Sequence, residues 1–160
     1  MPHSRTITAP LPAPGTDSRS LWQRVRELLG LTDEVSAGET DMEPARVVAI
    51  GFAPGTLDRL MEAGFTKQEI FDLVIPQRTL SHRKGKAVRL SRDESDRVLR
   101  VARIFTLTLQ VFGNRDKAWN WLRKPTWIFD NKAPLDFLDT EAGARAVEEE
   151  LIALAEGMFI

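Results

Sequence analysis

The chain has 160 residues, the length of one domain or of a small domain with an arm, and 42% of them are apolar, which is enough to form a core. With 22 basic and 23 acidic residues, the net charge is close to zero, which excludes a protein that coats a polyanion through its overall charge but not a local basic patch. The lack of cysteine excludes disulfides and thiolate sites, no apolar stretch could span a bilayer, and prolines interrupt any N-terminal secretory signal, so we expect a soluble, cytoplasmic protein.

Residues 1–45 are expected to form a flexible or weakly ordered arm that contains one short helix. Four prolines and several Ser and Thr residues fall within residues 1–18 and disfavour packing. A helix over residues 20–30 is indicated by apolar side chains at helical spacing, namely Leu21, Val25, Leu28 and Leu29. Residues 31–45 are acidic and weakly patterned, which is typical of a linker.

Residues 46–90 predict a helix-turn-helix domain. Its helices are expected over residues 54–61, 67–74 and 76–84. Thr66 and Glu69 form a capping box at the start of the second helix, and Pro76 both ends that helix and opens the next. Gly85 is expected to end the third helix.

Residues 91–160 predict a second helical domain. A capping box at Ser91 opens the longest helix, over residues 92–112, which is apolar nearly all round in its second half and therefore lies in the centre of the fold or half-buried in a partner. The remaining expected elements are a helix over 116–123, a loop over 125–139 and a helix over 141–156 that Gly157 terminates. Because no segment alternates as a strand does, we predict an all-α helical bundle.

The sequence contains no residue pattern that is typical of a catalytic site. His3 and His82 lack the partner spacing of a metal site, and neither is placed to activate a nucleophile. No glycine-rich phosphate loop follows a strand. Carboxylates such as those of Glu148, Glu149 and Glu150 occupy solvent-type helix faces instead of an apolar pocket, where general acid–base catalysis would need them. We therefore expect no enzyme, no metal and no cofactor.

Charge is unevenly distributed along the chain. Residues 76–103 contain nine basic and three acidic residues, whereas residues 136–160 contain seven acidic residues and one arginine. The segment IPQRTLSHRKGK resembles the second helix of a helix-turn-helix, with Leu80 directed inward. The residues expected to face base edges are Gln77, Arg78, Ser81 and His82, and those expected to hold phosphates are Arg83, Lys84 and Lys86. The alternative is a solvated basic helix in a three-helix scaffold that no longer binds DNA.

A series of motifs in a fixed order covers the chain from about Gly51 onward and leaves the first 45 residues uncovered. The motifs are GFTKQEIFDLVIPQRTLSHRK, LSRDESDRVLRVARI, FGNRDKAWNWLRKP, APLDFL and DTEAGARAVEEEL. Together they resemble the Xre/MbcA/ParS antitoxins, which accompany RES-domain toxins. In one departure, Asp130-Asn131-Lys132-Ala133 stands where that family usually has Gly-Gly before Pro-Leu.

The resemblance implies two functional units. Residues 46–90 would be an Xre-like helix-turn-helix that dimerises and represses its own operon, and residues 91–160 would bind the toxin. RES toxins consume NAD or use it for ADP-ribosylation, and the antitoxins of this family cover the NAD pocket with their C-terminal helix and tail. The expected partners are therefore a RES-domain toxin, operator DNA and a second copy of the chain or a higher hetero-oligomer, without a membrane.

Candidate toxin contacts lie in the last third of the chain. Each large side chain of Met158, Phe159 and Ile160 would lose about 1.5–3 kcal/mol of favourable burial free energy if it stayed in water. We therefore expect this segment to pack against the protein's own core, against a second copy in a dimer, or against the toxin. Trp119 is expected in the core, whereas Trp121 and Trp127 are the better interface anchors. Charged candidates on the last helix are Arg145, Glu148, Glu149 and Glu156.

These charged residues have simpler alternatives. The glutamates can form a solvated face, and Arg145 can pair with Glu141 or Glu149 at i±4. Three functions are therefore compared: an antitoxin, a stand-alone helix-turn-helix transcription regulator, and a metabolic enzyme, which the missing site chemistry disfavours. A RES-type gene beside this one would decide for the antitoxin.

Overall fold

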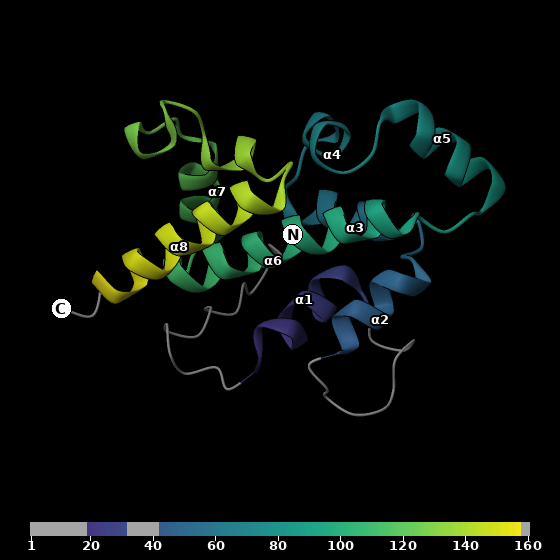
Figure 1. The fold of residues 1–160 in the computed structure, drawn as a ribbon, viewed down its shortest axis with the longest axis horizontal. Helices are drawn as coiled ribbons and strands as arrows, with labels where there is room; N and C mark the ends of the chain where they lie inside the picture. Colours follow the sequence, from purple (N-terminus) through teal and green to yellow (C-terminus); the bar gives the residue numbers. More distant parts are fainter. Residues whose placement is uncertain (1–18, 32–41, 158–160) are drawn as a thin grey trace, which may run out of the picture.

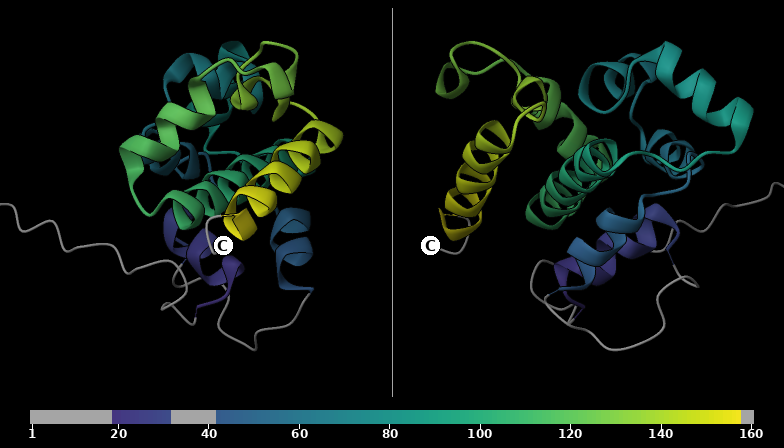
Figure 2. Two further views of the ribbon diagram at one scale, coloured as in Figure 1. Left: turned by 90° about the vertical axis from the view of Figure 1, so that its left-hand side faces the viewer. Right: turned by 45° about the vertical axis from the view of Figure 1, so that its right-hand side comes forward.

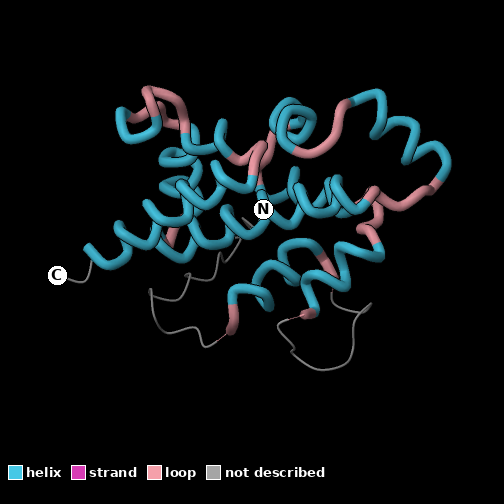
Figure 3. Tube along the Cα trace, viewed as in Figure 1, coloured by secondary structure: helices cyan, strands magenta, loops and turns pink. Residues whose placement is uncertain are grey.

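The computed structural model describes residues 19–31 and 42–157 (Figure 1). Within these ranges the chain forms eight α-helices and two short 3-10 helices, and no strand is present beyond an isolated bridge between Thr126 and Lys132 (Figure 3). The all-α prediction is confirmed. The arm expected over residues 1–18, most of the acidic linker, and Met158-Phe159-Ile160 lie outside the described residues.

Helix α6 (Arg92–Phe112) runs through the centre of the molecule and packs against α1, α2, α7 and α8 (Figures 1 and 2). The Ser91 hydroxyl accepts a hydrogen bond from Glu94 N at 3.1 Å, and the Glu94 carboxylate accepts one from Ser91 N at 2.6 Å, so the predicted capping box opens the helix. Val98 and Phe105 are fully buried. Other helices of the same chain surround this helix, which accounts for apolar residues on most of its sides.

Helices α1 (Leu21–Leu29) and α2 (Glu43–Ile50) belong to this core. Val25 and Leu29 of α1 are buried, so the predicted helix is a packed element of the core. Helix α2 was not expected, because its first residues continue an acidic stretch that is typical of a linker; Val47 and Val48 bury its apolar side. The linker assignment to residue 45 was therefore wrong for its last residues.

Helices α3 (Thr56–Ala63), α4 (Lys67–Leu73) and α5 (Gln77–Lys86) follow with short turns between them. Thr66 caps α4 through the predicted capping box, and Pro76 is the N-cap of α5. Gly85 was expected to end α5, but the helix continues to Lys86 and stops where Ala87 takes a left-handed φ of 51°. Donation from Ala87 N to the carbonyls of the last turn stabilises this end.

The C-terminal part consists of α7 (Arg115–Arg123), two 3-10 helices in the segment expected to be a loop, η1 (Trp127–Phe129) and η2 (Pro134–Phe137), and α8 (Glu141–Gly157). Between η1 and η2, Asp130 and Asn131 both have left-handed φ values, 54° and 60°, which Asp and Asn tolerate better than most residues. The departure from Gly-Gly thus keeps a turn that glycine would also form. Helix α8 comes so close to η2 that a Cβ at Gly143 would collide with the Phe137 carbonyl.

Candidate functional site

Helix α5 extends from one end of the molecule and is the element with the most open surface (Figure 1). Leu80 is its one buried residue, as predicted for the inward anchor. Gln77, Arg78, Ser81 and His82 are all exposed, and the Ser81 hydroxyl donates to the Gln77 carbonyl at 3.0 Å. The side chains expected to face bases therefore point away from the core, which is the arrangement that a recognition helix requires.

Two of the three residues expected to hold phosphates have partners within the protein. Arg83 Nη2 lies 3.4 Å from Glu94 Oε1, and Lys84 Nζ lies 3.2 Å from Asp58 Oδ1. Lys86 and Arg78 make no ion pair among the described residues. A phosphate would thus meet Lys86 and Arg78 directly, but would have to replace a carboxylate at Arg83 and Lys84.

Part of the basic segment binds the acidic last helix. Arg100 and Arg103 of α6 hold both carboxylate oxygens of Glu141, at 3.2 and 3.1 Å, and Arg103 also lies 3.9 Å from Glu148. Partial burial opposes ionisation of Glu141, but the hydrogen bonds and positive charge of Arg103 and Arg100 outweigh it and keep the pKa of this carboxyl below its usual value. The charge asymmetry of the sequence is therefore partly neutralised where α6 meets α8.

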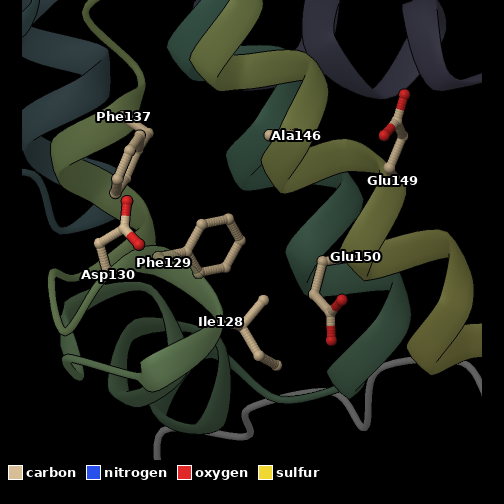
Figure 4. Close-up of a pocket in the computed structure, with 7 residues that line it drawn as sticks. All are labelled: Ile128, Phe129, Asp130, Phe137, Ala146, Glu149 and Glu150. Atoms are coloured by element: carbon tan, nitrogen blue, oxygen red, sulfur yellow. The ribbon is translucent and has the colours of Figure 1, made fainter.

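A second open surface lies where α8 faces the segment from η1 to η2. A hollow of about 350 Å³ separates them, and Figure 4 shows the side chains around it. The lining residues are Ile128, Phe129, Asp130, Phe137, Ala146, Glu149 and Glu150. A smaller hollow next to it shares Ile128, Phe129 and Glu150, and adds Trp121, Lys124 and Thr126.

The three C-terminal tryptophans occupy different environments. Trp127 is 81% exposed at the start of η1, beside Ile128, which is 44% exposed. Trp121 is half-buried, with its ring 5.7 Å from that of Phe112 and 6.4 Å from that of Phe129. Trp119 is buried, as predicted for a core residue. Trp127 is thus largely exposed to a partner, whereas Trp121 is accessible only at the smaller hollow.

The charged candidates on α8 divide into two groups. Glu148 is half-buried and close to Arg103, whereas Glu149 and Glu156 are exposed. Arg145 is exposed as well, and within the described residues it pairs with neither Glu141 nor Glu149. The i±4 pairing that was an alternative for Arg145 is therefore not formed; Glu141 pairs with Arg100 and Arg103 of α6.

The hollow beside α8 was not predicted, because its apolar lining comes from a segment that was expected to be only a loop. Ile128, Phe129 and Phe137 give this segment more large apolar side chains than a solvated loop needs, which was the available signal. Ala146 of α8 became a lining residue only through the close approach of α8 to η2.

Features of a catalytic or metal site are not found in the part of the chain that the structure describes. No group of three His, Cys, Asp or Glu side chains there could hold a metal ion, and no helix there is long and apolar enough to cross a membrane. Burial would raise the pKa of Glu69, but Arg123 and Thr66 outweigh it through hydrogen bonds and charge and lower that pKa. Glu69 and Glu141 are thus carboxylates kept ionised in ion pairs, unlike a general acid.

Comparisons with known proteins match both halves of the chain. The antitoxin Xre-like helix-turn-helix domain matches residues 43–103, and the antitoxin Xre/MbcA/ParS C-terminal toxin-binding domain matches residues 108–157. The two matches meet within α6, whereas we expected the domains to divide just before it. The hollow and the exposed Trp127 lie in the second match, and α5 lies in the first.

Curated proteins with the name Antitoxin Xre are similar to this chain. One from Pseudomonas putida strain KT2440 is 37% identical over 134 residues, which are 84% of this chain and 82% of that protein. One from Yersinia enterocolitica is 29% identical over 151 residues, or 92% of this chain and 96% of that protein. A third, from Photorhabdus laumondii, is 33% identical over 82 residues, or 50% and 55% of the two chains.

Proposed function

This chain belongs to the Xre/MbcA/ParS antitoxin family, and we propose that it neutralises a RES-domain toxin by covering the toxin's NAD-using active site. We further propose that it represses its own operon through the helix-turn-helix domain. Family membership points to a regulator without catalysis of its own. The observation that supports the proposal most directly is the 81% exposure of Trp127, which precedes the hollow-lining Ile128 within the toxin-binding domain.

Occlusion is favoured by a surface that is already ordered before the toxin binds. Arg100 and Arg103 fix the first turn of α8 to α6, and the packing of Gly143 against η2 fixes it to the adjoining segment. A pre-ordered surface loses little conformational entropy on binding, which favours tight association. Trp127 and Trp121 would anchor this surface, and the charges of Arg145, Glu148, Glu149 and Glu156 would orient the toxin.

The C-terminal segment is proposed to reach the NAD pocket itself. Helix α8 leads directly to Met158, Phe159 and Ile160, which lie outside the described residues. Removing these three residues should restore much of the toxin's NAD consumption, while the toxin still co-purifies with the truncated chain. Full inhibition by the truncated chain would reject insertion of this segment, but not the complex.

Operator binding is proposed to use α5. Gln77 and Arg78, near its N-terminus, would meet base edges, since Gln suits adenine and Arg suits guanine. Ser81, His82, Arg83, Lys84 and Lys86 would add further contacts, mostly to phosphates. A gel-shift assay with the operon's promoter should show binding that weakens steeply with salt, because each phosphate contact releases counterions.

A stand-alone transcription regulator would share the exposed α5 but would have no toxin partner. Co-expression with the neighbouring reading frame distinguishes the two functions, since an antitoxin should co-purify with the product of that gene. Sedimentation of the complex would also test the expected homodimer or higher hetero-oligomer. If the chain purifies alone and binds its promoter, the antitoxin proposal fails for this partner.

A further inference from the structure

We propose that the hollow between α8 and the η1–η2 segment, here called the α8 groove, receives a toxin segment in which an apolar side chain lies next to lysine or arginine. The groove is defined by Ile128, Phe129, Asp130, Phe137, Ala146, Glu149 and Glu150. This inference rests on the proposed function in one respect, namely that the partner is a toxin. It adds the chemistry by which that partner is recognised.

The floor of the groove is apolar and already built. The Phe129 ring lies 5.5 Å from the Phe137 ring, and Phe129 is 6% exposed, so it supports the floor. Ile128 is 44% exposed and covers the border with the smaller hollow. Figure 4 shows these side chains across from Ala146, whose single methyl group leaves space on the α8 side. An inserted apolar side chain would find a surface that needs no rearrangement.

The rim of the groove carries negative charge that no other described residue neutralises. Asp130 stands on the loop side, and Glu149 and Glu150 stand on α8. None of the three forms an ion pair or a side-chain hydrogen bond within the described residues. On the other flank of the same helix, Glu141 and Glu148 are paired with arginines of α6. Within the described residues, Glu141 and Glu148 of α8 therefore pair with α6, whereas Glu149 and Glu150 have no partner and are available to a cationic one.

Asp130 is the most informative of these carboxylates. Its backbone has a φ of 54°, a conformation that glycine adopts without steric cost. The carboxylate makes no hydrogen bond to its own turn in the described structure, so the turn itself does not require it. The side chain instead lines the groove, where its charge adds to that of the two glutamates. Its placement suits recognition of a cation better than formation of the turn.

Other occupants fit the rim less well. The residues after α8, Met158, Phe159 and Ile160, include apolar side chains but no cation. A second copy placed groove to groove would bring like charges together, which opposes association. A basic toxin segment satisfies both the apolar floor and the acidic rim. Lys124, which lines the adjoining hollow, does not line the α8 groove.

The test uses the full-length chain and the toxin purified from the neighbouring reading frame. Asp130→Asn removes the charge with a residue that also tolerates a left-handed backbone, and Glu149→Gln and Glu150→Gln remove the other two charges. The matched control is Asp116→Asn, an exposed carboxylate of α7 outside the groove that makes no ion pair among the described residues. Affinity for the toxin is measured by calorimetry at low and high salt, and thermal melting of each variant checks the fold.

The triple variant should bind the toxin about ten- to thirty-fold more weakly at low salt and lose most of the wild-type salt dependence, because the attraction is electrostatic. The control variant should change the affinity by less than about two-fold. Ile128→Ser should weaken binding at every salt concentration, since it removes an apolar contact. Unchanged affinity and salt dependence in the triple variant would overturn this inference and leave the antitoxin function standing.

The remaining outcomes identify another occupant. Tighter toxin binding after removal of Met158, Phe159 and Ile160 would mean that the chain's own end fills the groove. A change of sedimentation coefficient in free Ile128→Ser would mean that a second copy fills it. Either result would overturn the assignment to a basic toxin segment. Absence of toxin binding by the wild-type chain would instead contradict the proposed function.

Discussion

Replacing Trp127 by alanine should weaken toxin binding strongly without affecting the fold. The residue is 81% exposed in the free protein, so a partner can cover most of its side chain. A large aromatic side chain buries up to about 250 Å², so roughly 200 Å² is available here. At about 25 cal/mol per Å², this area corresponds to an upper limit of about 5 kcal/mol.

The observed loss should be smaller, because ordering and desolvation reduce the gain on binding. Truncation of a central interface tryptophan typically costs about 2 kcal/mol or more, which is at least about thirty-fold in Kd. Calorimetry or surface plasmon resonance with the purified toxin would measure this change in Kd, which should arise mainly from a faster dissociation rate. The melting temperature should change little, since the side chain supports no core contact.

Two further variants make this prediction specific. Ile50→Ala removes another exposed apolar side chain, 65% exposed on α2, and should leave toxin affinity unchanged. Trp119→Ala removes a buried ring that donates to the Ala63 carbonyl at 3.0 Å, and should cost about 3–5 kcal/mol of stability. A Kd for Trp127→Ala within about three-fold of the wild type would refute the proposed anchor.

Three further outcomes are expected. Gly64→Ala should lower the free energy of unfolding, measured by urea titration, by about 2 kcal/mol or more, because the φ at Gly64 is 117° and a Cβ would collide with the Trp119 indole nitrogen. An unchanged urea midpoint would contradict this packing. Glu141→Gln should lower the free energy of unfolding by about 1 kcal/mol at neutral pH. Because folding lowers the pKa of Glu141, the difference in stability from the wild type should vanish as the pH falls through that lowered pKa. A difference that persists in acid would show that the ionisation of Glu141 is not involved. Arg78→Glu should abolish operator binding in a gel shift while toxin affinity stays the same, and an unchanged shift would exclude α5 as the recognition helix.

Local chemistry explains why most helices could be predicted from the sequence. The capping boxes at Ser20, Thr66 and Ser91 involve residues three apart, so the signal and its structural effect lie in the same few residues. Helix α2 lacks such a signal and is stabilised by burial of Val47 and Val48 against the rest of the core. Tertiary packing of this kind overrides weak local patterning.

The sites depend on contacts between distant residues, which the sequence does not reveal. The pairing of Lys84 with Asp58 joins residues 26 positions apart, so the competition for a proposed phosphate contact is visible only in the structure. The burial of Trp119 could be predicted from its helical spacing with Leu122, whereas the half-burial of Trp121 depends on Phe112 and Phe129. The acidic rim likewise combines Asp130, in the turn after η1, with Glu149 and Glu150 of α8, a proximity that only the structure shows.

Hydrogen exchange of the chain, free and bound to its toxin, tests most directly the claim that the toxin-binding domain uses α8 and the η1–η2 segment. Amides in residues 127–137 and in the exposed half of α8 should exchange more slowly in the complex, whereas those of α5 should not change. Protection confined to α5, or to helices α1 to α3, with the α8 groove unaffected, would contradict this account.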